Sequence, residues 1–562
     1  MKSIAILCFF TLIFFSDTLL AAPPAYAFRV KFKDKNGTLG FADSLSFLSQ
    51  KSLERRSKQG IALDSTDLPV VPAYITQVMN ASSAVKLHNV SKWFNQIVVI
   101  TLDSSKVIDI AALPIVENVK LVAIYPNGVF KNEVSATPEK FPSPTPVSSP
   151  VQFKKDRGTS AYYGLAFQQI DIMQGDYLHD NGYKGEGMDI AVFDVNFRYT
   201  NTCPAYDSIN LQNRIKDVYN FARDTPYVYS TTITSDHGMN VLGCMAANIP
   251  GTYVGTAPNA NFYLYITEDW LTEQPIEEDN WLSAAERCDS LGVYIINSSL
   301  GYNTFTHFTS ASYNYSNMDG KTSLIAKAAD KTVSKGIFVV NAQGNEGAAS
   351  WHYMITPADA DSVYSVGSVD GSGNWANSGY GPTFDGRTKP DGCAMGKSTL
   401  LIGGSCNPGA ANGSSFASPV LCGSIACLWQ SAPTLTAFQL RRIVRMCSDR
   451  YNAPNHTLGY GVPNFELARS IVLGTAEVTN IDYTFSLFPN PTTGKFTVRS
   501  YDPSIENVAY ALYDLQGKLI YKSEKLSNAN FQSDILEQVS AGEYFIVISS
   551  INKTYSTKIV KK

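Results

Sequence analysis

Four short polar segments contain the residue types that nucleophilic catalysis needs. Asp194 ends an apolar run, and His237 and Ser415 each open an apolar stretch with a helical pattern. A serine hydroxyl becomes a nucleophile near pH 7 when a neutral imidazole takes its proton and a carboxylate orients that imidazole. Asn345 follows a further apolar run, where its amide can join the Ser415 backbone N–H at a helix N-terminus in stabilising an oxyanion. We therefore predict Asp194, His237 and Ser415 as catalytic residues and Asn345 as an oxyanion-hole residue.

Each of these residues has a commoner structural explanation when it is taken alone. A single histidine, or a single aspartate at a strand end, is most often structural, and the run Gly-Ser-Ser-Phe at 413–416 is by itself an ordinary turn. The chain order Asp, His, Ser, with each residue on a suitable element, favours catalysis over these explanations.

Apolar runs at regular intervals predict the scaffold that positions these residues. The runs contain almost no polar residue, which is typical of strands buried on both faces in a mostly parallel sheet. They lie at 188–193, 262–266, 293–296, 336–340 and 363–366. Polar residues recur where the runs end, and the carboxyl edge of such a sheet is where ligands bind. We predict an α/β domain over residues 152–474, with a parallel sheet covered by helices on both faces.

Composition excludes several other classes of protein. With 562 residues, 44% of them hydrophobic and 12% aromatic, the chain can bury a large core, which excludes global disorder. A net charge of −4 argues against a nucleic-acid binder and against a polybasic membrane binder. Of the nine cysteines, Cys8 lies in the predicted leader described next, so an even number remains and their pairing stays open.

The N-terminus has the pattern of a secretory signal peptide. A lysine at position 2 precedes an apolar run at 4–15, and Ala25-Tyr26-Ala27 forms a small-residue cleavage signal. We predict a signal peptide over 1–27, cleaved before Phe28. No later segment is long and apolar enough to span a membrane, so we predict no transmembrane segment.

Three further segments differ in texture from the α/β domain. Residues 28–135 contain short alternating runs, and 136–151 are rich in proline, serine and threonine, which is typical of an extended, exposed linker. Residues 480–562 contain short strand-like runs separated by glycine and asparagine turns, which predict a small all-β sandwich. A compact module, a linker and a large domain in this order indicate a propeptide ahead of its enzyme.

The motifs around the polar segments resemble those of subtilisin-like serine proteases of the S8 class. They are His237-Gly238-x-x-Val241-x-Gly243, Gly413-Ser-Ser-Phe-Ala-Ser-Pro419, Gly344-Asn345, Ser299-Leu300-Gly301 and Gly459-Tyr-Gly-Val-Pro-Asn464. The resemblance implies a serine endopeptidase acting on protein or peptide substrates through an acyl-enzyme, with Ser299, Leu300 and Gly301 as substrate-binding residues. The family usually has glycine two residues after the catalytic aspartate. Here Asn196 stands instead, and we expect it to accept a left-handed turn.

The flanking segments carry resemblances of their own. Residues 28–135 are similar to an inhibitory, α+β propeptide, mainly by position. Phe488-Pro-Asn-Pro491, Gly517-Lys518 and the basic C-terminus resemble the C-terminal sorting domain of the Bacteroidetes type IX secretion system. These resemblances imply a zymogen inhibited by its own propeptide, and a secreted or cell-surface location reached through the signal peptide and the type IX machinery. We expect no nucleic-acid partner.

An acidic stretch leaves substrate preference open. It contains Glu268, Asp269, Glu273 and the run Glu277-Glu278-Asp279, and Glu346 lies beside the predicted oxyanion donor. These carboxylates could favour basic substrate residues or bind calcium. We expect instead that the stretch is a solvated surface loop. We predict no metal site and no required cofactor, because no motif supports a structural calcium ion.

Two other functions are compatible with the same residues. A catalytically silent surface-binding protein would keep the fold without the chemistry, and a hydrolase of small esters or amides would share the chemistry. Labelling by a serine-directed probe distinguishes an enzyme from the silent binding protein. Only activity on different substrates distinguishes an endopeptidase from a hydrolase of small esters or amides.

Overall fold

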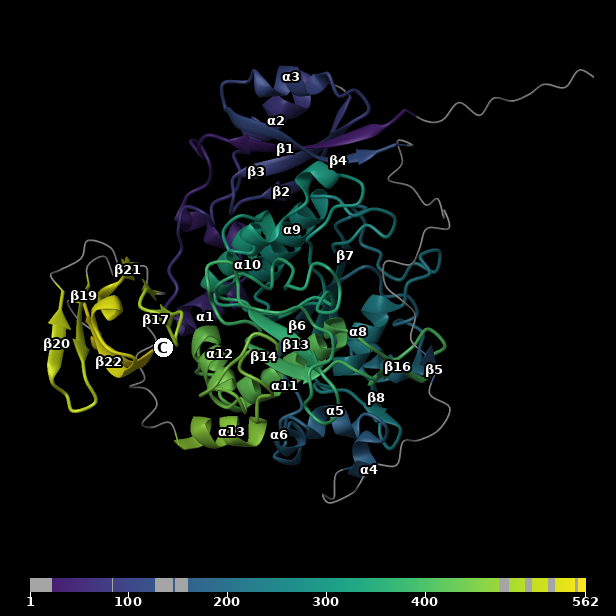
Figure 1. Cartoon of the computed structure of the whole chain (residues 1–562). Helices are drawn as coiled ribbons and strands as arrows, with labels where there is room; N and C mark the ends of the chain where they lie inside the picture. The colour runs from purple at the N-terminus through teal and green to yellow at the C-terminus, as the bar shows by residue number, and fades with distance from the viewer. Residues whose placement is uncertain are drawn as a thin grey trace, which may run out of the picture.

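The computed structural model describes residues 23–82, 84–126, 145–146, 160–474, 485–500, 508–523, 531–550 and 554–562. Most of the predicted signal peptide, and most of the predicted linker over 136–151, lie outside the described residues. A small N-terminal unit lies on a large central unit, and a small β-sandwich lies beside the central unit (Figure 1).

The N-terminal unit is a small α+β fold, as predicted. Its four-stranded antiparallel sheet has the order β2-β3-β1-β4 and pairs over β1 (Ala25–Phe32), β2 (Val85–Ser91), β3 (Gln96–Thr101) and β4 (Val116–Tyr125). Helices α2 (Pro72–Ala81) and α3 (Lys106–Ala111) cover one face through a shared apolar core. Because β1 begins at Ala25, cleavage before Phe28 would remove residues that pair with β3 and β4; the cleavage site stays a prediction.

A long excursion leaves this unit between β1 and α2. It contains η1 (Phe41–Ser46) and α1 (Gln50–Lys58), and Ser49 caps α1 by accepting from the Ser52 N–H. The excursion runs down the flank of the central unit, so that α1 lies far below the N-terminal sheet, near α10 and α12 (Figure 1).

The central unit is built on a parallel sheet of seven strands in the order β14-β13-β12-β11-β6-β10-β7. The strands are β6 (Asp189–Asp194), β7 (Ile215–Asn220), β10 (Asn261–Ile266), β11 (Ile295–Ser298), β12 (Phe338–Ala342), β13 (Tyr364–Val369) and β14 (Gly392–Met395). In β6, alternate residues enter two different cores: Ile190 and Val192 contribute to one, and Ala191 and Phe193 to the other. This two-sided burial confirms the predicted fold class.

Helices cover both faces of this sheet. One core includes residues of α8 (His237–Ala246), α11 (Ser414–Ser431), α12 (Ala437–Met446) and α13 (Phe465–Gly474). The other includes residues of α9 (Ile276–Leu291) and α10 (Leu324–Ser334). The shorter elements of the unit are α4 (Ser160–Tyr163), α5 (Phe167–Asp171), α6 (Asp176–Asp180), η2 (Pro204–Tyr206), α7 (Asp207–Leu211), β8 (Asn248–Ile249), β9 (Tyr253–Val254), η3 (Thr309–Ala311), η4 (Tyr315–Asn317), β15 (Thr399–Ile402) and β16 (Pro408–Ala411).

The C-terminal unit is the predicted all-β sandwich of two antiparallel sheets. One sheet has the order β17-β18-β21 and the other β20-β19-β22-β23, and their facing residues share one core. The elements are β17 (Phe485–Phe488), β18 (Phe496–Ser500), β19 (Ala509–Tyr513), β20 (Leu519–Lys522), β21 (Phe531–Ser533), η6 (Ile535–Gln538), β22 (Gly542–Ser549) and β23 (Thr554–Lys561). Within the described parts of the chain, no helix is long and apolar enough to cross a membrane.

One disulfide settles part of the cysteine pairing. It joins Cys203, in the loop after β6, to Cys406, in the turn between β15 and β16. The six other cysteines of the described chain are free and buried. Because Asp194 precedes Cys203 by nine residues and Ser415 follows Cys406 by nine, the bond links two loops that lead to predicted catalytic residues.

Replacing Cys203 and Cys406 together by serine is expected to lower the free energy of unfolding by about 2–5 kcal/mol, because the bond constrains a long loop in the unfolded chain. Denaturant unfolding in a Ser415→Ala background, where we expect no self-digestion, measures the change. As a control, a reducing agent should destabilise the parent chain and leave the double variant unchanged. Equal responses to the reducing agent would contradict the prediction.

Candidate active site

The carboxyl edge of the sheet brings Asp194 and His237 together. Asp194 is the last residue of β6, and its Oδ1 accepts hydrogen bonds from the His237 Nδ1, at 2.8 Å, and from the Val195 N–H. Both side chains are buried, and the Asp194 Oδ2 has no hydrogen-bond partner among the described residues. A side chain on Gly238 would collide with Asp194 and with the Asn196 carbonyl, so glycine is required for this close approach. The arrangement holds the Nδ1 proton and leaves Nε2 as the basic nitrogen.

Ser415 lies in the first turn of α11, and the chain around it explains the motif residue Pro419. Pro419 has no N–H with which to bond the carbonyl of Ser415, four residues earlier. That carbonyl instead accepts from the Ser299 Oγ at 2.8 Å, and the Ser415 Oγ lies 3.2 Å from the Ser299 carbonyl oxygen. The proline therefore ties the start of the helix to the loop after β11, which holds Ser415 in place.

Asn345 is oriented by its neighbour Ser414. Its Oδ1 accepts from the Ser414 backbone N–H at 2.8 Å. Because the oxygen is held in this way, the Nδ2 of the same amide is available to donate to a bound group. The Ser414 Oγ also donates to the Gly344 carbonyl at 2.9 Å. Two segments far apart in sequence are thus locked together, and both predicted oxyanion donors, the Asn345 amide and the Ser415 N–H, border the same space. The role of Ser414 was missed from the sequence, although it stands inside the serine motif.

One cavity of about 730 Å³ unites the predicted residues. Its lining includes His237, Ser415 and Asn345, together with the predicted substrate-binding residues Ser299, Leu300 and Gly301. Asp194 lies behind His237 and does not line it. The lining also contains Phe416, whose ring centroid is 5.5 Å from that of His237, and Ile355, against which a Cβ on Gly301 would press.

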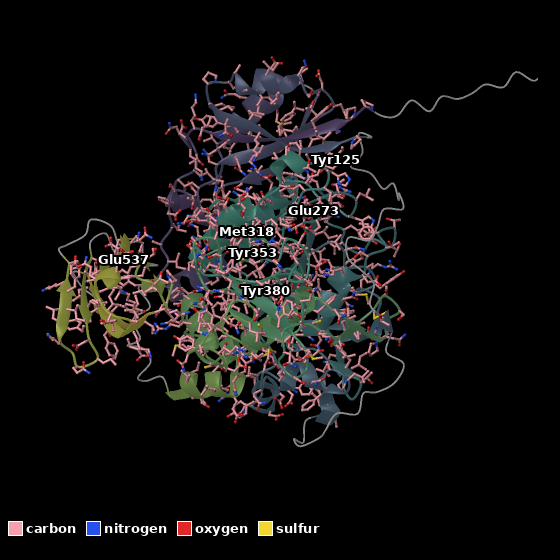
Figure 2. The ribbon with its side chains drawn as sticks, in the orientation of Figure 1. Tyr125, Glu273, Met318, Tyr353, Tyr380 and Glu537 are labelled. Carbon is pink, nitrogen blue, oxygen red and sulfur yellow. A yellow bond between two sulfur atoms is a disulfide. The ribbon has the colours of Figure 1, made fainter. Side chains whose placement is uncertain are left out.

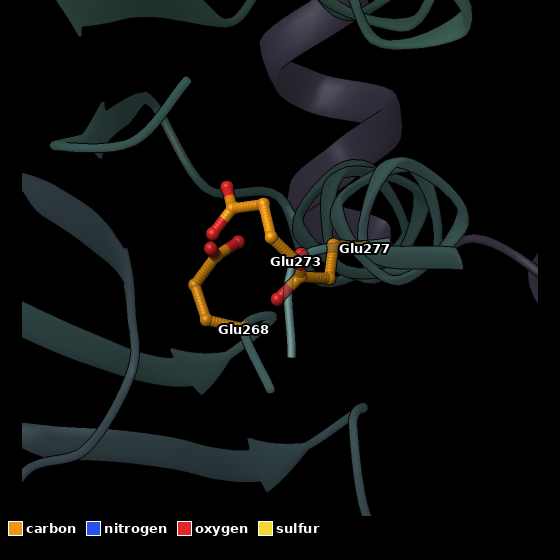
Figure 3. Close-up of side chains that lie close together, drawn as sticks. All are labelled: Glu268, Glu273 and Glu277. Atoms are coloured by element: carbon orange, nitrogen blue, oxygen red, sulfur yellow. The ribbon is translucent and has the colours of Figure 1, made fainter. Parts of the chain in front are cut away.

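Among the described residues that line the cavity, the carboxylate side chains are all glutamates: Glu268, Glu273 and Glu346. Burial raises the pKa of Glu346, whose carboxylate accepts from the Asn345 N–H at 2.6 Å. Tyr302 donates to Glu268, and Glu273 is half-buried. Figure 3 shows Glu268, Glu273 and Glu277 close together, and one carboxylate oxygen from each lies within 4.8 Å of the other two. The cavity lining therefore carries three carboxyl groups, one of them beside the oxyanion-hole residue Asn345.

The expectation that the acidic stretch is a solvated surface loop is wrong. Glu268, Asp269, Glu277, Glu278 and Asp279 are all buried, because α9 lies beneath the N-terminal unit. Glu277 accepts from the N–H groups of Asp269 and Gln274, which shapes the loop before α9. Burial raises the pKa of Glu278 to about 7, against the opposing effect of nearby Arg29. Hydrogen bonds within the protein thus account for much of this stretch, and we assign no ion to it.

Asn196 does not adopt the left-handed turn expected from the sequence. Its φ is not positive. Its buried side chain instead donates to the carbonyls of Ser230, at 2.8 Å, and Ile233, at 3.2 Å. The amide therefore fastens the loop that precedes His237. A glycine could not make these bonds, so the departure from the family motif has a structural role.

The N-terminal unit packs against α9 and the loop that precedes it. Asp279 pairs with Arg29 of β1 at 2.6 Å, and Glu286 accepts from the Ser91 hydroxyl and from the N–H groups of Lys92 and Trp93. At the end of β4, the Ile124 N–H donates to Gln274 at 2.8 Å. Tyr125, labelled in Figure 2 where the two units meet, is buried close to Asp269.

A short piece of the predicted linker reaches the cavity itself. Thr145 and Pro146 form β5, which pairs antiparallel with Ala410 and Gly409 of β16. Thr145 lines the cavity that contains Ser415. At these two residues the linker is therefore an added strand and not simply an exposed spacer.

Comparisons with known proteins agree with this architecture. Residues 185–461 match the subtilase family, 27–137 match the peptidase S8 propeptide domain of Bacteroidota, and 486–562 match a secretion system C-terminal sorting domain. Subtilisin DY of Bacillus licheniformis is 29% identical over 304 residues, which cover 53% of this chain and 97% of that protein. Subtilisin NAT of Bacillus subtilis subsp. natto and subtilisin E of Bacillus subtilis (strain 168) are each 30% identical over 276 residues. These matches cover 48% of this chain and 63% of each relative.

The parallel sheet, the covering propeptide fold and these matches define a serine endopeptidase of the subtilisin-like class. Its central unit is a subtilase-family domain over residues 185–461, preceded by an S8 propeptide domain and followed by a type IX secretion sorting domain. The sorting domain indicates secretion or attachment at the cell surface.

Proposed function

We propose that this chain is a secreted zymogen whose processed form cleaves peptide bonds with Ser415 as nucleophile, His237 as general acid and base, and Asp194 as the orienting carboxylate. The observation that carries the proposal is the 2.8 Å contact between Asp194 and His237, whose ring lines the same cavity as Ser415 and Asn345.

The reaction follows from the positions of these groups. The Ser415 Oγ attacks the substrate carbonyl carbon and passes its proton to the His237 Nε2, while Asp194 stabilises the imidazolium. The resulting oxyanion accepts from the Ser415 N–H and the Asn345 Nδ2. His237 then protonates the leaving amine, which departs and leaves an acyl-enzyme on Ser415. A water molecule, deprotonated by His237, attacks the acyl carbon. The bond to the Ser415 Oγ then breaks, and His237 returns the proton to that oxygen as the acid leaves.

The substrate is proposed to bind as an extended strand along Ser299, Leu300 and Gly301. Backbone hydrogen bonds from such a strand do not depend on side chains, so they suit an enzyme that cleaves within polypeptides. Gly301 has no side chain to hold the substrate away from the loop after β11. The added strand Thr145–Pro146 supports this mode of binding, because it shows an extended segment of the chain paired beside the cavity.

In the precursor, the propeptide is proposed to act as an intramolecular inhibitor, and the signal peptide and the sorting domain to direct export. A fluorophosphonate probe should label Ser415 in the secreted protein once its propeptide has been removed. N-terminal sequencing of the processed protein should find a start between about 136 and 165. Helices α4 and α5, which begin at residue 160, belong to the packed central unit, and Tyr163 is fully buried. We therefore expect the processed chain to start before residue 160. Active protein that begins at Phe28 would contradict the zymogen, and absence of labelling would favour the silent binding protein.

A peptide-library cleavage profile is expected to favour lysine and arginine near the scissile bond, since Glu268, Glu273 and Glu346 supply negative charge to the cavity. Glu268→Gln and Glu273→Gln should each reduce the preference for arginine over leucine by about tenfold, or ~1.4 kcal/mol. Glu466→Gln, on α13, removes a carboxylate outside the cavity lining and is the matched control. An unchanged profile in both cavity variants would assign these glutamates a structural role only.

A further inference from the structure

The excursion that contains α1 makes a second contact with the central unit, separate from the propeptide sheet. We call residues 48–67 the clasp segment. It lies against the C-terminal ends of α9 and α10 and the N-terminus of α12 (Figure 1). Lys51 of the clasp pairs with Asp189, which begins β6, whereas Asp194 ends that strand. The clasp therefore lies at the edge of the sheet opposite the active site, where it does not obstruct the cavity.

Two arginines form the centre of this contact. The Arg55 guanidinium is fully buried and donates to the Val293 carbonyl and to Asp289, each at 2.6 Å. Arg56 bridges Asp289, at 2.6 Å, and Asp67 of the clasp itself, at 2.8 Å. A buried guanidinium paired at both ends is strongly held, because removing one partner leaves a charge without compensation.

The central unit supplies complementary groups to the clasp. Lys335, which caps the end of α10, is buried beneath the clasp and pairs with Asp67 at 2.8 Å and with Asp64 at 3.1 Å. Gln59 donates to the Gly336 carbonyl at 2.7 Å and accepts from the Ala437 N–H, the first of α12, at 2.9 Å. Helix ends expose unpaired carbonyl and N–H groups that favour charges of opposite sign. The clasp thus satisfies three helix ends at once.

The two contact surfaces use different parts of α9. The propeptide sheet binds Asp279 and Glu286 and reaches the Ser290 hydroxyl through Lys92, at 2.9 Å. The clasp binds Asp289 and the Ser290 carbonyl at the C-terminal end, so among the described contacts the two surfaces meet only at Ser290. When two surfaces are joined by one chain, dissociation requires both to open together, so retention exceeds that of either surface alone.

We propose, on the basis of the zymogen function above, that the clasp segment is a second binding surface for the propeptide that is independent of the active site, and that it holds the propeptide on the processed enzyme after the linker is cut. The partner of the surface formed by Asp289, Lys335 and the ends of α9, α10 and α12 is the chain's own N-terminal fragment.

The test measures release of the N-terminal fragment and not catalysis. A site-specific protease sequence is inserted within 136–151 of the full Ser415→Ala chain, the linker is cut, and dissociation of the fragments is followed by gel filtration over time. The unaltered pair should stay together, and Arg55→Ala/Arg56→Ala should release the fragment at least about 100-fold faster. Lys58→Ala, which removes an exposed charge from the same helix, is the matched control and should change the rate by less than about twofold.

Two further variants keep the result decisive. Arg29→Ala weakens only the sheet contact, and its effect should multiply with that of the clasp variant if the surfaces are independent. Gln59→Ala removes two neutral hydrogen bonds and should speed release about fivefold, which decides the matter if the double arginine variant does not fold. Equal release rates for the unaltered and clasp-variant chains would overturn the proposal. The release test uses a chain without Ser415, so a failure of the protease function would appear only in the labelling of Ser415 in enzyme freed of its propeptide, and the two outcomes are distinguishable.

Discussion

Replacing Ser415 by alanine is expected to lower kcat for peptide cleavage by about 10⁶ in the processed form. The Ser415 hydroxyl oxygen is the atom that becomes covalently attached to the acyl group, so the substitution removes the nucleophile. Single-turnover cleavage of a fluorogenic peptide at equal protein concentrations measures the loss, with the active sites of the parent titrated by a fluorophosphonate probe. The KM should change little, since the methyl group of alanine leaves the cavity walls and the Ser299–Gly301 strand in place.

Ser424→Ala is the matched control for this substitution. Ser424 lies on the same helix, and its hydroxyl donates to the Val420 carbonyl within the buried core, away from the cavity. We expect kcat within about twofold of the parent. Residual activity in Ser415→Ala above about one hundredth of the parent would show that another group is the nucleophile. If the chain processes itself, the Ser415→Ala protein should be secreted with an intact linker.

Sequence alone predicts those parts of the molecule whose signals are local. The central strands are mostly apolar, because both faces are buried, and the runs at 188–193 and 262–266 overlap β6 and β10. Edge strands carry less signal. In β7, Asp217 accepts from Arg287 and lies half-buried at the sheet edge, and β14 is only four residues long and begins with glycine. Neither strand could be recognised from its pattern.

The features that sequence analysis missed or misjudged depend on contacts between distant segments. The acidic stretch at 268–279 has the composition of a solvated loop, and it is buried because a unit that precedes it by more than a hundred residues covers it. Arg55 and Arg56 stand in a polar, charged helix that would be expected to be exposed. Their partner Asp289 is over two hundred residues away. Charged residues buried in pairs leave no pattern in either segment alone, so only the structure reveals the clasp.

Asp194→Asn is expected to lower kcat by about 10⁴ while leaving the fold intact. The side chain keeps its size and can still accept from the His237 Nδ1 and the Val195 N–H. The negative charge that stabilises the imidazolium is lost, however, and the new amide group occupies a buried position where the Asp194 Oδ2 has no partner among the described residues. An amide turned to satisfy its own N–H would donate to Nδ1, which places the imidazole proton on Nε2 and removes the base.

Asp189→Asn makes the same chemical change at the other end of the same strand and is the matched control. Asp189 is also fully buried, but it faces Lys51 of the clasp segment and not the cavity. We therefore expect kcat of the processed form to remain within about threefold of the parent and the release of the propeptide to accelerate. The opposite pattern, with kcat preserved in Asp194→Asn and lost in Asp189→Asn, would remove Asp194 from the triad. Since the two carboxylates stand at opposite edges of one sheet, the comparison separates catalysis at the carboxyl edge from propeptide binding at the amino edge.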